Sequence, residues 1–243
     1  MGGPVMQENN ILSYIKNAMR NGRFILQLLR SRTQRKHVFR WIRSLKQNYL
    51  IDATVPWLVF DAIDYIKPRL FNGMSVFEYG SGGSTLFWLY CGANVVSIEH
   101  NHRWYNLLEK KIHSNQLIDY RLIVPMAIIQ NDLDFDPSDP EKYFSANDSF
   151  RSYEFHNYVT QIDACPNEYF DLILIDGRAR PSCIKHSVKK VKIGGHIILD
   201  NSDREYYHTK TESYFNNFLK TEFYGAGPLN NVKWKTNIYT RMN

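Results

Sequence analysis

The chain has 243 residues and a formal net charge of +6, a length that suits one α/β domain with an extension and is short for two domains. It has no apolar run of 18 or more residues, which excludes a membrane-spanning helix. Its three cysteines, Cys91, Cys165 and Cys183, have no C-x-x-C spacing, so we expect neither a disulfide framework nor a zinc site. No signal-peptide apolar region follows Met1, and we expect a cytoplasmic protein.

The N-terminal region, residues 1–50, differs from the rest in charge. Residues 11–50 contain no Asp or Glu and ten basic residues, namely Lys16, Arg20, Arg23, Arg30, Arg32, Arg35, Lys36, Arg40, Arg43 and Lys46. Apolar residues recur there at helical spacing, for example Val38, Trp41 and Leu45, which predicts a basic amphipathic helical extension. Such a helix can cover its own domain, contact anionic lipid at the inner face of a membrane or a lipid-linked acceptor, or bind nucleic acid. Nucleic acid is the least favoured of these, because no recognisable nucleic-acid module accompanies the charge.

Strand and helix patterns alternate after the extension. We expect a helix over 54–67, ended by Pro68, and a strand over 74–79. A glycine-rich turn and a helix over about 85–91 follow, and then a strand over 94–99, a helix over 102–114 and a short strand near 120–124. This alternation predicts a mostly parallel sheet with helices on both faces.

Residues 126–160 interrupt the alternation with interleaved aspartates and prolines. We expect a solvated loop or one that covers a substrate, and Tyr153, His156 and Tyr158 either line a pocket or pack in the core. The sheet then resumes with a strand over 170–176, a helix after Pro181 and a strand over 195–200. The last segment reads as two strands around a turn at 225–229.

The most informative stretch runs from Val76 to Thr85 and contains Glu78-Tyr79-Gly80-Ser81-Gly82-Gly83-Ser84. Glycines let a strand turn sharply into a helix while the backbone approaches a ligand closely. Glu99 ends the next strand, 21 residues after Glu78, where a ribose-binding carboxylate sits in a nucleotide-binding βαβ unit. Position 85 is Thr where the dinucleotide fingerprint has its third glycine, which argues against NAD. In the alternative interpretation, the glycines only form a turn and Glu99 is a solvated carboxylate at the end of a strand.

The string Glu-x-Gly-x-Gly-Gly resembles motif I of the class I S-adenosylmethionine-dependent methyltransferases. Three further segments match this family in order: Glu99, Tyr169–Asp176 and Lys192–Asn201. The resemblance covers roughly residues 54–241 and implies a Rossmann-like seven-stranded sheet closed by a C-terminal antiparallel hairpin, with residues 51–243 as the catalytic domain. It implies S-adenosyl-L-methionine as cofactor, bound by Glu78, Tyr79, Gly80, Ser81, Gly82, Gly83, Ser84, Glu99, His100 and Asp176.

Asp176, Asp200 and Asn201 follow two neighbouring strands, so their oxygens should converge on the acceptor side of the crevice. Three such donors suit Mg²⁺. The set resembles metal-dependent O-methyltransferases of the catechol and macrolide-sugar type, whose lysine base is replaced here by Ala179. The neighbouring Arg178 and Arg180 stay protonated and suit an anionic or hydroxyl-rich acceptor. In the alternative interpretation, Asp176 binds cofactor and caps its loop, while Asp200 and Asn201 cap the next helix.

The base is expected among His156, His186 and His208, and we take Asp176, Arg178, His156 and His208 as the catalytic candidates. No Asn/Asp-Pro-Pro-Tyr string occurs, which argues against methylation of base amino groups. We therefore expect an O-methyltransferase for a small molecule or glycan, with a sugar hydroxyl favoured. The alternatives are an RNA or protein methyltransferase that docks through the basic extension, and a catalytically silent membrane-associated binding module. The sequence leaves open whether the protein forms a homo-oligomer.

Overall fold

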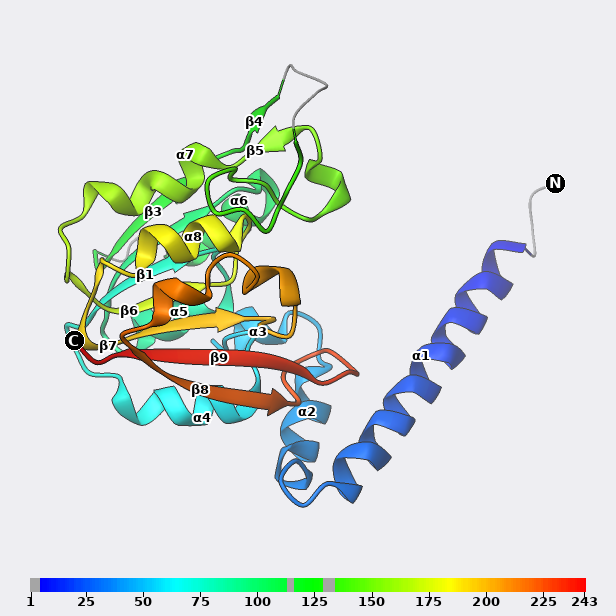
Figure 1. Cartoon of the computed structure of the whole chain (residues 1–243). Coiled ribbons are helices and arrows are strands. Elements are labelled where there is room, and N and C mark those ends of the chain that lie inside the picture. The colour runs from blue at the N-terminus through cyan, green and yellow to red at the C-terminus, as the bar shows by residue number, and fades with distance from the viewer. Residues whose placement is uncertain (1–4, 113–115, 129–133) are drawn as a thin grey trace.

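A computed structural model describes residues 5–112, 116–128 and 134–243. Its centre is a seven-stranded sheet of order β3-β2-β1-β6-β7-β9-β8 (Figure 1). The strands are β1 (Ser75–Tyr79), β2 (Asn94–Glu99), β3 (Ile118–Leu122), β6 (Phe170–Ile175), β7 (Val191–Asp200), β8 (Phe218–Gly225) and β9 (Trp234–Arg241). All neighbours pair in parallel except β9, which is antiparallel to β7 and β8. The expected Rossmann-like sheet with its C-terminal hairpin is confirmed.

Alternating side chains of the central strands enter two apolar layers, one on each face of the sheet. Val76 and Leu174 join the layer with α4 (Phe60–Ile66) and α5 (Gly83–Tyr90). Phe77 and Ile175 join the layer with α7 (His156–Val159) and α8 (Arg180–Ser187). A further helix, α6 (His102–Ile112), follows β2. The carboxyl ends of β1, β2, β6 and β7 therefore meet at one edge, where open α/β sheets bind ligands.

Element boundaries differ from the expected ones in four places. The strand expected over 195–200 begins at Val191, because its first residue pairs with Phe170 of β6. The helix expected over 54–67 begins only at Phe60, because Thr54 adopts a left-handed φ of 49° and the Val59 N–H donates to Thr236 Oγ1 (3.2 Å) instead of to a helical turn. The strand near 120–124 is shifted to 118–122 by its register with β2. Within 126–160, β4 (Met126–Ala127) and β5 (Tyr153–Glu154) form a small antiparallel ribbon that the sequence did not indicate. Residues 113–114 of the expected helix and 129–133 of the loop lie outside the described residues.

The N-terminal region forms α1 (Val5–Arg30), α2 (Val38–Ser44) and α3 (Tyr49–Asp52). Helix α1 projects away from the body and meets it near its C-terminal end (Figure 1). There Phe24 and Leu28 are buried, and the Phe24 ring packs edge-on against Trp41. Trp41 Nε1 in turn donates to the Asn230 carbonyl (2.7 Å), so the segment after α1 covers its own domain. No helix in the described ranges is long and apolar enough to span a bilayer.

Candidate active site

The glycine loop connects β1 to α5 and needs its glycines for close backbone packing. Gly80 has a φ of 90°, and a Cβ there would lie 3.0 Å from the Gly177 Cα in the loop after β6. A Cβ on Gly83 would collide with the carbonyl oxygens of Val55 and Leu50. Gly82 faces more open space, with the Trp104 indole 3.8 Å from its would-be Cβ. The loop is thus held between the N-terminal segment and the β6 loop, and it is open near Gly82.

Glu99, at the end of β2, holds this loop in place. Its Oε2 accepts hydrogen bonds from Ser81 N and Oγ (both 3.1 Å), and its Oε1 accepts from the N–H groups of His100 and Asn101 (both 2.8 Å). Burial opposes ionisation, but the hydrogen bonds and the nearby His100 ring outweigh it and hold the pKa of Glu99 below its ordinary value. The Ser81 hydroxyl is an exchangeable donor, because Tyr120 OH lies 2.8 Å from it as another partner. An ionised carboxylate is therefore available for a ribose hydroxyl beside an open glycine, which fits S-adenosylmethionine.

Glu78 and Tyr79 support the loop from inside the sheet. Glu78 is fully buried and accepts hydrogen bonds from Thr85 Oγ1 (2.5 Å), Ser97 Oγ (2.7 Å) and Trp88 Nε1 (3.3 Å). Tyr79 lies on the opposite face and donates to the Val159 carbonyl (2.8 Å). Neither side chain reaches the crevice in this structure, whereas Ser81 and Gly82 border it.

Glu78 should make stability depend on pH. Desolvation raises its pKa to about 7, above that of the unfolded chain. A carboxyl group shifted in this direction stabilises the fold at low pH, and the contribution is lost as pH rises through the folded-state pKa. We expect the unfolding free energy to fall by about 3 kcal/mol between roughly pH 4.5 and pH 7 on account of Glu78. Urea unfolding of wild type and Glu78→Gln across this range tests it; parallel curves would contradict the assignment.

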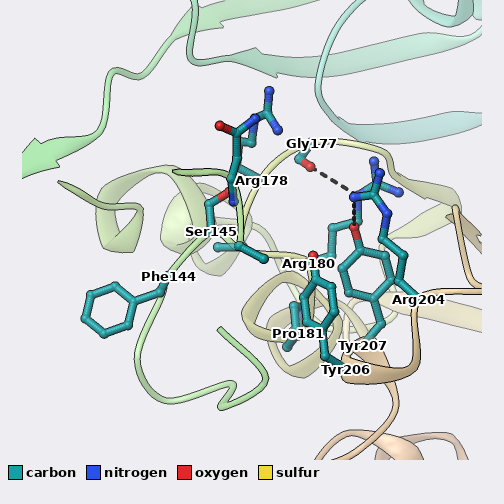
Figure 2. A pocket seen from close by; sticks show the side chains of 12 residues that line it. Phe144, Ser145, Gly177, Arg178, Arg180, Pro181, Arg204, Tyr206 and Tyr207 are labelled. Carbon is teal, nitrogen blue, oxygen red and sulfur yellow. Dashed lines mark hydrogen bonds between the residues drawn. The ribbon is translucent and has the colours of Figure 1, made fainter. Parts of the chain in front are cut away.

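A cavity of about 360 Å³ lies next to the glycine loop, at the carboxyl ends of β6 and β7. Residues 144–147 form one wall of the cavity and residues 204–207 form the other (Figure 2). Residues 177–181, which run from the end of β6 into α8, also line the cavity. Gly177 borders both this cavity and the glycine loop. None of the lining residues is Asp or Glu, while three are arginines: Arg178, Arg180 and Arg204. Residues 144–147, within the segment 126–160, thus border this cavity.

Arg180 connects the ends of β6 and β7 in a buried network. Its guanidinium pairs with Asp176 Oδ1 (2.8 Å) and donates to the carbonyl oxygens of Gly177 (3.1 Å) and Asp200. The Asp200 carboxylate Oδ1 accepts from Thr236 Oγ1 (2.6 Å) and Trp234 Nε1 (2.9 Å) of β9. Burial raises the pKa of Asp200, and the Arg180 charge opposes that rise. The Arg180 guanidinium therefore already supplies a positive charge between the ends of β6 and β7.

This network does not fit the expected Mg²⁺ site. Arg180 pairs with Asp176 Oδ1, and Asp200 is buried with its Oδ1 accepting two hydrogen bonds from β9. Asn201 starts a turn with a φ of 47°. In the described part of the chain, the one group of three His, Cys, Asp or Glu side chains in reach of a single ion is His37, Asp61 and Asp64, in and near the N-terminal segment. We therefore derive no catalytic step through a metal.

The three histidines proposed as bases lie outside the cavity lining. His186 pairs with Asp163 (2.8 Å), His208 Nε2 contacts the Ser202 carbonyl (2.8 Å), and His156 packs against the Tyr143 ring on the surface. His100 is closer, since its Nε2 lies 3.4 Å from Nε of Arg178. Tyr158 is buried in the core, and Tyr153 is exposed outside the cavity.

The sequence did not single out the residues of the two outer walls, which are Ser145, Asn147, Arg204, Tyr206 and Tyr207. Ser145 and Asn147 lie outside any helix or strand, and Tyr206 and Tyr207 lie in the short 3-10 helix Glu205–Tyr207, which is too short to show a periodicity. The available signal was the Arg-Glu-Tyr-Tyr string at residues 204–207, shortly after Asp200-Asn201, because residues that follow a strand end tend to reach the ligand edge.

Solved structures have a similar fold. A Klebsiella pneumoniae protein provisionally assigned as an O-methyltransferase aligns with a TM-score of 0.53 at 14% identity, covering 84% of this chain and 90% of its own. This chain has the class I methyltransferase fold. A methyltransferase from Geobacter sulfurreducens aligns over 84% of this chain and 89% of its own, at 10% identity and a TM-score of 0.48. A variant of MtNAS solved with S-adenosylmethionine aligns over 95% of this chain and 75% of its own, at 12% identity and a TM-score of 0.44.

No protein-family model and no curated protein matches the sequence. At these identities the likeness shows the class I methyltransferase fold alone. The activity has to be argued from the site.

Proposed function

We propose that this protein is an S-adenosylmethionine-dependent O-methyltransferase that acts on a hydroxyl group of a small molecule or glycan, a sugar being the favoured acceptor. The observation that carries the proposal is the juxtaposition at Gly177. On one side lies a glycine loop anchored to the ionised Glu99, and on the other a polar cavity whose lining residue Arg180 pairs with Asp176. A donor site and an acceptor site thus share one backbone segment.

Bound S-adenosylmethionine would supply an electrophilic methyl group next to the acceptor. The chain's own part is to align the acceptor hydroxyl, exclude water and take up its proton. We assign the last task to Asp176, because 26% of its side chain is accessible, it directly precedes the lining residue Gly177, and it pairs with the lining residue Arg180. Burial raises its pKa and so makes it a stronger base, while Arg180 keeps it oriented through the 2.8 Å pair. Arg178 and Arg204 have no carboxylate partner among the described residues, and we assign them to binding the acceptor.

The donor site is tested by replacing Glu99. Glu99→Ala removes the ribose-binding carboxylate and the two anchors of Ser81, so we expect affinity for S-adenosylmethionine to fall about 10- to 100-fold, since hydrogen bonds to a charged group contribute about 1.5–3 kcal/mol. Titration calorimetry with S-adenosylmethionine and its demethylated product measures this. Glu109→Ala, an exposed carboxylate on α6, is the matched control. If wild type binds neither compound, the cofactor assignment is wrong.

We also propose that α1 brings the protein to an anionic lipid surface. Ile15, Met19, Leu26 and Leu29 are exposed on α1, at spacings that place them along one side of the helix. Lys16, Arg20, Arg23 and Arg30 are exposed on the same helix, and residues 11–50 contain no acidic residue. A second copy of α1 would bring like charges together, whereas anionic headgroups complement them.

Vesicle co-sedimentation tests this surface. Wild type should bind vesicles that contain about one third phosphatidylserine and not pure phosphatidylcholine vesicles, because roughly 1 kcal/mol is gained per basic residue near an anionic surface. The double variant Met19→Asp/Leu26→Asp should lose this binding, whereas Tyr90→Asp, at an exposed aromatic residue on α5, should keep it. Absence of lipid binding together with RNA binding that falls steeply with salt would favour the RNA methyltransferase alternative.

A further inference from the structure

The cavity beside the glycine loop presents guanidinium groups that no carboxylate neutralises. Within the described ranges, neither Arg178 nor Arg204 has an acidic side chain within ion-pair distance. By contrast, an acidic side chain pairs with each of Arg40, Arg121, Arg180 and Arg241. The Arg178 guanidinium lies 5.3 Å from the Phe150 ring centroid, and Arg204 donates to Tyr207 OH (2.9 Å). Both therefore keep unused donors at the cavity.

Arg180 provides the internal contrast. It lines the same cavity, but its charge is compensated by Asp176 and its donors are used by backbone carbonyl oxygens. It is buried, whereas Arg178 is half-buried and Arg204 exposed. Arg180 thus belongs to the framework, whereas Arg178 and Arg204 line the cavity without a carboxylate partner in the described structure (Figure 2).

We propose that this cavity binds the oxyanion of a negatively charged acceptor, a phosphate or carboxylate group on the molecule that carries the methylated hydroxyl. This inference rests on the proposed function, because that function makes the cavity the acceptor site. Two guanidiniums present planar pairs of N–H donors that match the oxygens of either group. The remaining wall supplies neutral polar groups, including Ser145, Asn147 and Tyr206, which suit hydroxyls next to the anion.

The size of the cavity restricts the acceptor further. Its volume of about 360 Å³ is at the low end of small-molecule pockets, which span about 300–1,000 Å³. Such a volume suits a monosaccharide-sized anion better than an internal unit of a long polymer. The absence of Asp and Glu from the lining also means that a cationic acceptor would find no partner there.

Calorimetry with defined probes tests the proposal on the full chain saturated with the demethylated cofactor. Inorganic phosphate and acetate are titrated at constant ionic strength, followed by glucose 6-phosphate and glucose. We expect at least one of the two anions to bind, and the charged sugar to bind at least tenfold more tightly than glucose if phosphate is the anion. The double variant Arg178→Gln/Arg204→Gln should lose tenfold or more in anion affinity, and Arg32→Gln, an exposed arginine after α1, should not.

Thermal unfolding is the control for the folding of the double variant. We expect this variant to be folded, because both arginines make few internal contacts. If phosphate and acetate bind neither form, or bind the double variant and wild type equally, the anionic acceptor is ruled out. If the demethylated cofactor still binds in that case, the methyltransferase proposal stands and only the acceptor class is wrong. Binding of acetate without phosphate, or the reverse, identifies which oxyanion the cavity recognises.

Discussion

Replacing Asp176 with asparagine is expected to lower kcat by about 10²- to 10⁴-fold, the usual contribution of a general base, while the affinity for S-adenosylmethionine stays within about twofold. Asparagine keeps the shape of the side chain but cannot accept a proton. The prediction follows from the position of Asp176, whose partly accessible side chain pairs with the cavity residue Arg180 and which directly precedes the lining residue Gly177. The measurement is the turnover of any acceptor that wild type methylates, together with calorimetric binding of the methyl donor.

The pH dependence of kcat gives a second readout. Burial raises the pKa of Asp176 above its ordinary value, and the Arg180 charge opposes the rise. A base acts in its ionised form, so kcat of wild type should increase as pH rises through the shifted pKa, and the residual rate of Asp176→Asn should lack that step. Asp203→Asn, at an exposed aspartate beyond β7, is the matched control and should keep the wild-type profile. Wild-type turnover by Asp176→Asn would remove Asp176 from the mechanism.

Replacing Arg180 with leucine is expected to lower the unfolding free energy by about 3–5 kcal/mol, because removing one partner of a buried pair leaves an uncompensated charge. Here two carboxylates lose their cation, Asp176 directly and Asp200 through its shared network. Both then ionise less readily in the folded state, and a carboxyl pKa that is raised on folding costs stability as pH increases. The loss should therefore be larger near pH 8 than near pH 5. Urea unfolding at these two values is the measurement.

Two variants separate this effect from a loss of side-chain volume. Arg178→Gln, two residues away, should change the unfolding free energy by no more than about 0.5 kcal/mol, because that guanidinium has no carboxylate partner in the described structure. The double variant Asp176→Leu/Arg180→Leu should be less destabilised than Arg180→Leu alone, since it removes one of the stranded charges. Equal losses in Arg178→Gln and Arg180→Leu would show that the network does not stabilise the fold in this way.

Much of the sheet could be predicted from local patterns. The apolar runs that end at Tyr79, Glu99 and Asp176 each lie at a strand end in the structure, because fully buried parallel strands read as continuous apolar stretches. The glycine run and its partner Glu99 were also predictable, since both requirements are local to one βαβ unit. The structure adds that Ser81 joins the two directly.

The acceptor side was less predictable because its chemistry depends on distant segments. The sequence places Asp176, Asp200 and Asn201 together, but not the donors Trp234 and Thr236, which reach Asp200 from a strand that pairs antiparallel some 35 residues later. Without those donors the three oxygens predict a metal site. With them, and with Arg180 in the buried pair, the same oxygens become part of the framework. A wall such as residues 204–207, which holds only a three-residue 3-10 helix, carries no periodicity from which its position could be inferred.

The contact between Gly80 and Gly177 has a consequence for acceptor choice. The glycine loop and the loop that borders the cavity touch through backbone alone, without a side chain between them. Under the proposed function, the separation of the two substrates would therefore be set by peptide geometry, which rotamer changes cannot lengthen or shorten. A different acceptor would then have to be accommodated at the outer walls, 144–147 and 204–207, while the distance over which the methyl group travels would remain constant.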